Sequence, residues 1–202
     1  MKRAHRSDLF GWSRFDEGRD IDFHSWAWLR SAGAVVVDPL PISDHDREQL
    51  GAVSHVIVTN SDHLRAARRL AASSGAVLCG PLAERESLDL GPTARWVDDG
   101  EVIVPGLRAL ALEGSKTPGE LALVLEEQSL ITGDLIRSHA GGALHLLPDP
   151  KLSNRTAALR SLDRLCAIET VEAVLVGDGW PVFCDGRDRL LELRARELGR
   201  DV

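Results

Sequence analysis

The chain has 202 residues, of which 44% are hydrophobic and 27% are charged, the composition of an ordinary globular protein with a full core. Its formal net charge of −7 argues against binding to nucleic acid or to an anionic membrane, because both attract basic surfaces. The start of the chain, MKRAHRSDLFGW, lacks the apolar stretch of a signal peptide, and no run of about 18 apolar residues follows it, so we expect a cytoplasmic protein.

The first half of the chain alternates predicted strands with predicted helices. Short apolar runs that end at Gly, Pro or polar residues are typical of strands, and runs rich in Ala, Leu and Arg are typical of helices. Ser43 is a suitable N-cap and Gly75 a suitable C-cap. In chain order we predict strands over Ile21–Arg30 and Gly33–Pro39, a helix over Ser43–Leu50, a strand over His55–Thr59, a helix over His63–Ser74 and a strand over Ala76–Cys79.

The second half is dominated by strands with an antiparallel character. The runs ELALVLE and SLIT are separated by only a few polar residues, which predicts a hairpin. In chain order we predict strands over Glu101–Val104, Leu107–Glu113, Glu120–Glu126 and Ser129–Thr132, a helix over Ser153–Glu169, a strand over Glu172–Gly177 and a helix over Asp185–Leu198. About nine strands with few helices indicate two packed sheets with helices outside, in a single domain over residues 1–202.

Residue types that bind metals or carry out proton transfer follow several of the predicted strands. Asp62 and His63 come after the strand HVIVT, and the turn GSKTPGE comes after LRALALE. Asp134 lies in TGDL at the end of the strand SLIT, and Asp178 lies in the glycine-flanked turn VGDGW. Loops at the ends of successive strands are where scaffolds build binding and catalytic sites.

This order and spacing resemble the metallo-β-lactamase superfamily, whose members are mostly metal-dependent hydrolases with an αββα sandwich fold. The family pattern is H-x-H-x-D-H after a strand, a G-H-T-P-G-like turn, a G-D at a strand end and a late G-H-G. The segment TPGELALVLEEQSLITGDLI, Thr117–Ile136, carries the most specific part of the resemblance. The resemblance implies a four-layer αββα sandwich for this chain.

The same resemblance shows that most of the family's metal-binding histidines are replaced. The first three-histidine site would fall on Val58, Asn60 and Lys116, where valine cannot ligate a metal and the lysine ammonium repels a cation. The late histidine falls on Asp178, while the bridging aspartate survives as Asp134. We therefore expect the first metal site to be lost and at most one ion to bind.

The resemblance implies that the remaining ion is held by Asp62, His63, Asp134 and Asp178. This oxygen-rich set suits manganese or iron(II) better than copper, and also permits zinc. Water activated by the ion would attack an ester, thioester, lactone or similar bond of a small-molecule substrate. The implied catalytic residues are Asp134, which would ligate or orient the water, and Lys116, which would stabilise the oxyanion and pair with Asp134. We assign Asn60, Thr117 and Trp180 to the pocket lining.

Charge alone leaves a metal-free alternative open. Three converging carboxylates need a cation or a proton, and Lys116 with a protonated His63 would supply two positive charges. The pocket would then bind a small anionic ligand or a protein partner without catalysis. A nuclease function is disfavoured, because the family's nucleases carry an extra domain and the net charge opposes it. Each residue also has a structural alternative: Asp62 as an N-cap, Asp134 and Asp178 as turn residues, and Lys116 as a surface lysine.

Overall fold

The computed structural model describes residues 1–199, and the chain divides into two compact units, Met1–Val97 and Asp98–Val202. Each unit contains its own sheet and two helices longer than one turn. Over the described residues, no helix is long and apolar enough to cross a membrane.

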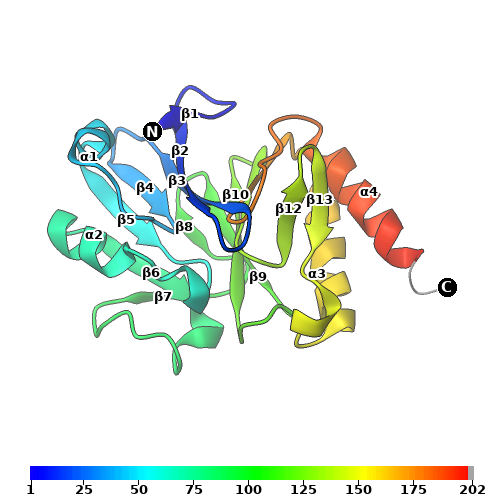
Figure 1. Cartoon of the computed structure of the whole chain (residues 1–202). Helices are drawn as coiled ribbons and strands as arrows, with labels where there is room; N and C mark the ends of the chain where they lie inside the picture. Colours follow the sequence, from blue (N-terminus) through cyan, green and yellow to red (C-terminus); the bar gives the residue numbers. More distant parts are fainter. Residues whose placement is uncertain (200–202) are drawn as a thin grey trace. The chain divides into compact units, whose positions relative to one another are not determined.

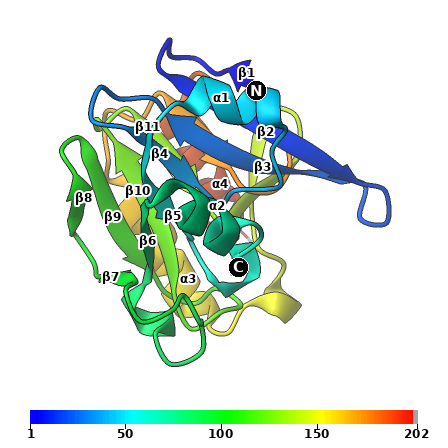
Figure 2. The ribbon, with the colours of Figure 1, turned by 90° about the vertical axis from the view of Figure 1, so that its left-hand side faces the viewer.

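The first unit is built on a seven-stranded sheet in which the strands follow one another in chain order. Strands β1 to β4 pair antiparallel, and β4 to β7 pair parallel. The long β2–β3 hairpin projects from one edge (Figure 2). The strands are β1 Lys2–Arg3, β2 Leu9–Asp16, β3 Ile21–Trp28, β4 Ala34–Val37, β5 Val53–Ile57, β6 Val77–Pro81 and β7 Arg95–Val97.

The connections between the parallel strands carry the helices of this unit. They are α1 Asp44–Leu50, the 3-10 turns η1 Ser61–His63 and η2 Leu82–Glu84, and α2 Ala67–Ser74. Helix α2 lies against β5 and β6 (Figure 2), and its Ala67, Leu70 and Ala71 join Val36, Val56 and Leu78 in one apolar core. This packing fixes η1 and the end of β5, where the first group of site residues lies.

The second unit is built on a five-stranded sheet with the order β14-β11-β10-β9-β8. All neighbours are antiparallel except β11 and β14, which are parallel. A separate hairpin, β12–β13, lies beside helix α4 (Figure 1). The elements are β8 Val102–Val104, β9 Leu107–Leu112, β10 Glu120–Leu125, β11 Ser129–Thr132, β12 Ile136–Ala140, β13 Ala143–Leu146, η3 Asp149–Lys151, α3 Arg155–Cys166, β14 Ala173–Val176 and α4 Gly186–Leu198.

The core of the second unit joins one face of this sheet to the two helices. Leu162 and Leu165 of α3 and Leu190 of α4 pack with Val124 of β10 and Val174 of β14. All six residues of β10 are buried, including its first residue, a glutamate. A buried ionisable side chain at the first residue of β10 indicates that this end of the strand belongs to the candidate functional site.

Every predicted strand is present within a few residues of its expected bounds, but the sequence underestimates the number of strands. Strands β1, β2, β7, β12 and β13 are not predicted. Segment β12, with the sequence IRSHA, is polar and lacks regular alternation, so its sequence indicates a loop. Its Arg137 is nevertheless buried, because the guanidinium forms an ion pair inside the unit.

The predicted helix His63–Ser74 is wrong in its first half. The chain forms η1 and then breaks at Arg65, whose φ is +39°, before α2 begins at Ala67. The Arg65 guanidinium donates to the carbonyl oxygens of His24 and Asp38 at 2.5 and 3.1 Å. These bonds stabilise the break between η1 and α2 and prevent a continuous helix.

Candidate functional site

In the first unit, the orientation of His63 is fixed by a buried carboxylate. Nδ1 of His63 lies 2.8 Å from Oδ2 of Asp38 and 3.2 Å from the hydroxyl of Thr59. An ionised carboxylate can only accept a hydrogen bond, so Nδ1 of His63 carries the proton. The remaining ring nitrogen, Nε2, is then the atom that is chemically suited to bind a cation.

Asp38 is itself held by the end of the neighbouring strand. Its two carboxylate oxygens accept hydrogen bonds from the Thr59 amide at 2.8 Å and the Thr59 hydroxyl at 2.7 Å. Asp38, Thr59 and His63 are all buried. The imidazole therefore sits in a rigid carboxylate–histidine pair, the arrangement that commonly orients a metal ligand.

The other residues of the first motif have clear structural positions. Asn60 is buried and caps η1, because its Oδ1 accepts a hydrogen bond from the Asp62 amide at 3.0 Å. The N-cap alternative for Asp62 is therefore wrong, since Asn60 holds that position. Asp62 is exposed and Val58 is fully buried in the core. Val58 and Asn60 thus both have local structural roles.

In the second unit, Lys116 is paired with Asp134, as the sequence predicts. Nζ of Lys116 lies 3.1 Å from Oδ2 of Asp134, and the carboxylate is fully buried while the lysine side chain is 29% exposed. The lysine side of the pair is thus partly open to solvent, whereas the carboxylate is not. The Asp134 carboxylate is therefore accompanied by a cation.

A second buried acid, Glu120, lies behind this pair. Its carboxyl accepts hydrogen bonds from the Ser115 hydroxyl at 2.6 Å, the Asp134 amide at 2.7 Å and the Leu135 amide at 2.9 Å. Burial, and then the negative charge of Asp134, raise the pKa of Glu120 from 4.5 to about 7. The same donors favour the ionised form and limit this rise.

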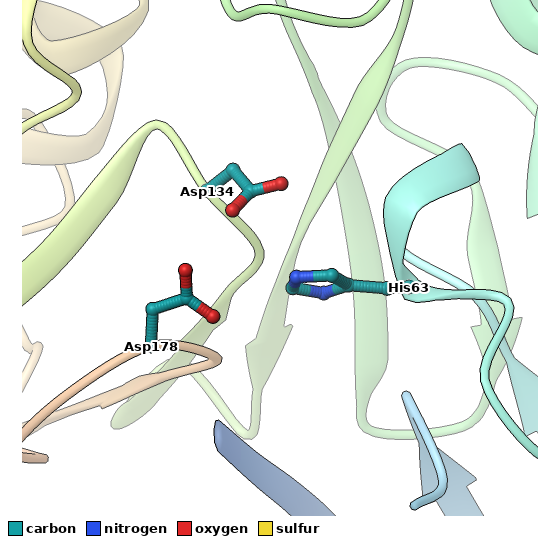
Figure 3. Close-up of side chains that lie close together, drawn as sticks. All are labelled: His63, Asp134 and Asp178. Carbon is teal, nitrogen blue, oxygen red and sulfur yellow. The ribbon is translucent and has the colours of Figure 1, made fainter. Parts of the chain in front are cut away.

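Asp178 lies on the turn after β14 and is paired with a cation that the sequence did not reveal. Its Oδ2 forms an ion pair with the guanidinium of Arg137, and both side chains are buried. Oxygens of Asp134 and Asp178 lie within 4.8 Å of each other, and the two carboxylates face one another in Figure 3. The figure also shows the imidazole of His63, which projects from η1 of the first unit.

The charges of this cluster in the second unit are balanced in pairs. Asp134 and Asp178 carry two negative charges, and Lys116 and Arg137 carry two positive charges. Each ion pair uses Oδ2, and each carboxylate also has Oδ1 as a donor atom. Carboxylate oxygens of this kind are common ligands of small divalent ions. The donor set therefore fits one small divalent ion and also a pocket without one.

The remaining predicted pocket residues lie on the loops of the second unit. Thr117 is half-buried, and its hydroxyl donates to the Gly119 carbonyl at 2.8 Å within the T-P-G turn. Trp180 is 62% exposed, and its amide donates to the Ser138 carbonyl at 2.9 Å.

Sequence reasoning missed three site residues: Asp38, Glu120 and Arg137. The GAVVVDP run places Asp38 at a strand end, which is the only available signal for it. Glu120 is predicted only as a strand residue and Arg137 receives no role, because burial cannot be inferred for a charged residue without its partner.

Comparisons with known proteins support the fold. A family model described as Metallo-beta-lactamase superfamily matches residues 1–197. The DIM-1 metallo-beta-lactamase is 14% identical with a TM-score of 0.72, and the match covers 97% of this chain and 96% of that chain. A metallo-beta-lactamase family protein from Thermus thermophilus is 19% identical with a TM-score of 0.71, and the match covers 98% of this chain and 81% of that chain.

A metallo-beta-lactamase from Pontibacter korlensis is 15% identical with a TM-score of 0.69, and the match covers 94% of this chain and 96% of that chain. No curated protein sequence shows significant similarity. At these identities the structural matches establish the fold alone, and they confirm the predicted fold class.

The turn that presents Asp178 requires glycine at position 179. Gly179 has a φ of +93°, and a Cβ there would lie 1.6 Å from the Ser138 carbonyl oxygen. We expect Gly179→Ala to lower the free energy of unfolding by about 3 kcal/mol or more, because overpacking is added to backbone strain. Gly142→Ala is the matched control, since Gly142 has a φ of +76° and no atom within 4 Å of the added Cβ. Equal losses in urea unfolding would contradict the close contact.

The raised pKa of Glu120 predicts a specific dependence of stability on pH. The folded chain retains this proton to higher pH than the unfolded chain, so the stabilisation is complete below pH 4.5 and is lost as pH rises to about 7. The loss is on the order of 3 kcal/mol. Urea unfolding between pH 4.5 and 8 with EDTA should therefore give a shallower pH dependence for Glu120→Gln than for wild type. The control is Glu113→Gln, because that side chain is exposed; identical slopes for the two variants would refute the prediction.

Proposed function

Because the chain belongs to the metallo-β-lactamase superfamily, we propose that it is a hydrolase that uses a single divalent metal ion. The proposed ligands are His63, Asp134 and Asp178, with Asp62 as the further donor that the family motif supplies. Manganese, iron(II) or zinc suits these carboxylate and imidazole donors. The proposed substrate is a small molecule with an ester, thioester or lactone bond.

One observation carries this proposal: the hydrogen bond of 2.8 Å between His63 Nδ1 and Asp38. Burying an ionised carboxylate costs free energy unless its oxygens are satisfied. Here Thr59 and His63 satisfy them, and the result is an imidazole whose Nε2 has a fixed direction. A histidine with only a packing role does not need this degree of orientation.

In the proposed reaction, the ion and Lys116 have different roles. When bound, the ion would lower the pKa of a water molecule toward about 7 and polarise the bond to be cleaved. Lys116, whose side chain is partly exposed, would bind the negatively charged oxygen that develops on the substrate. Asp134 would hold Lys116 in place through the 3.1 Å ion pair and would also contribute an oxygen to the ion.

The proposal is limited to one ion because the other set of ligands is absent. Val58 is an apolar core residue, Asn60 uses its side chain to cap η1, and Lys116 is a cation. A metal at that second position would be repelled by the ammonium of Lys116. The lysine charge takes the place of part of the charge that a second metal would bring.

Removal of His63 tests the proposed hydrolase directly. Tag-free protein is assayed on ester, thioester and lactone substrates with added manganese, iron(II) or zinc. We expect His63→Ala to reduce the metal-dependent rate by about 100-fold or more, since loss of even a residue that supports a ligand costs 10–100-fold. The matched control is His45→Ala, because His45 is exposed and its ring contacts Gln49 on the same short helix.

Two results would count against the hydrolase. The first is equal activity of His63→Ala and His45→Ala. The second is the absence of metal-dependent hydrolysis by the wild type on all three substrate classes. This second result would favour the other candidate function, a pocket that binds a small anionic ligand or a protein partner without catalysis. The paired charges of Lys116 with Asp134 and of Arg137 with Asp178 favour that candidate, because they balance the buried acids without a metal.

A further inference from the structure

We propose that Glu120 is a positioning residue, which clamps together the two loops that present Lys116 and Asp134. The inference deepens the proposed function and rests on it, because these two side chains form its catalytic pair. Glu120 lies entirely inside the second unit, at the first residue of β10. It touches the backbone of one loop and a side chain of the other.

The carboxyl group of Glu120 contacts two different loops. On one side, Glu120 Oε2 accepts a hydrogen bond of 2.6 Å from Ser115, the residue before Lys116. On the other side, Glu120 Oε1 accepts bonds from the amides of Asp134 and Leu135 at 2.7 and 2.9 Å. One carboxyl group therefore ties the start of the T-P-G turn to the turn after β11.

A carboxyl group is unfavourable at this buried position, so its role lies in the groups that it binds. Glu120 is fully buried, and the next residues of β10 include the buried Leu121 and Leu123. Placing an acid here brings it close to the charge of Asp134, which is unfavourable in a low-dielectric interior. An apolar residue would avoid that repulsion but would leave the two amides of the Asp134 turn without this acceptor.

The clamp has a direct consequence for the catalytic pair. Lys116 and Asp134 come from different loops, and their ion pair requires those loops to stay in register. Ser115 and the Asp134 amide are the points at which Glu120 holds the two loops. Release of the carboxyl would let Lys116 and Asp134 separate without removing either of them.

The clamp is tested on the full-length chain with EDTA present, by the coupling between Lys116 and Asp134. A double-mutant cycle with Lys116→Met and Asp134→Asn measures this coupling in urea unfolding. We expect the coupling to be present in the wild type, lost in Glu120→Ala and restored in Glu120→Gln, because a glutamine oxygen can still accept from the two amides. The exposed pair of Arg108 with Glu127, at 3.1 Å, is the control and should keep its coupling in both variants.

The outcomes separate clearly. Coupling that persists in Glu120→Ala would overturn the clamp, and so would its loss in Glu120→Gln. If Glu120→Ala does not fold, Glu120→Asp replaces it, because the shorter side chain withdraws the carboxyl from the amides while keeping its charge. The cycle is then expected to show reduced coupling in Glu120→Asp, and full coupling there would equally overturn the clamp.

A second readout connects the clamp to the proposed metal. In calorimetric titrations with zinc or manganese, we expect Glu120→Ala to bind about 10–100-fold more weakly than Glu120→Gln, as for other residues that support a ligand. Equal affinities of these two variants would contradict the clamp. If the wild type binds no metal, the proposed hydrolase fails, while the metal-free coupling experiment still decides for or against the clamp.

Discussion

The candidate site depends on the neutralisation of buried carboxylates. In the second unit, Asp134 and Asp178 have oxygens within 4.8 Å of each other, and both side chains are almost fully buried. Two ionised acids at that separation repel strongly unless cations accompany them. Lys116 and Arg137 provide those cations, so side-chain charges balance the two acids.

Three residues near the candidate site have structural roles: Val58 packs in the apolar core, Asn60 caps η1, and Lys116 neutralises the charge of Asp134. The retained histidine, His63, is fixed by Asp38 within the first unit. Asp38 also accepts two hydrogen bonds from Thr59, which offset the cost of burying its charge.

The sequence predicts the framework well because the framework depends on local patterns. The hairpin of β10 and β11 follows from two apolar runs joined by polar residues, and Asp134 follows from the G-D at its end. The partners of the site could not be predicted in the same way. Asp38 lies 25 residues from His63, and Arg137 lies 41 residues from Asp178, so nothing in the local sequence connects them. The polar strand β12 could not be predicted for the same reason, because the burial of its Arg137 depends on Asp178, which is distant in the sequence.

The most direct test of this account is the number of metal ions that one chain binds. Native mass spectrometry of the tag-free, full-length protein would count them after incubation with zinc or manganese and removal of excess ion. The proposed hydrolase predicts one ion per chain, because the ammonium of Lys116 would repel a second ion while Asp134 and Asp178 would offer oxygens to the first. Two ions would contradict the replacement of a metal by side-chain charge, and none would contradict the proposed hydrolase.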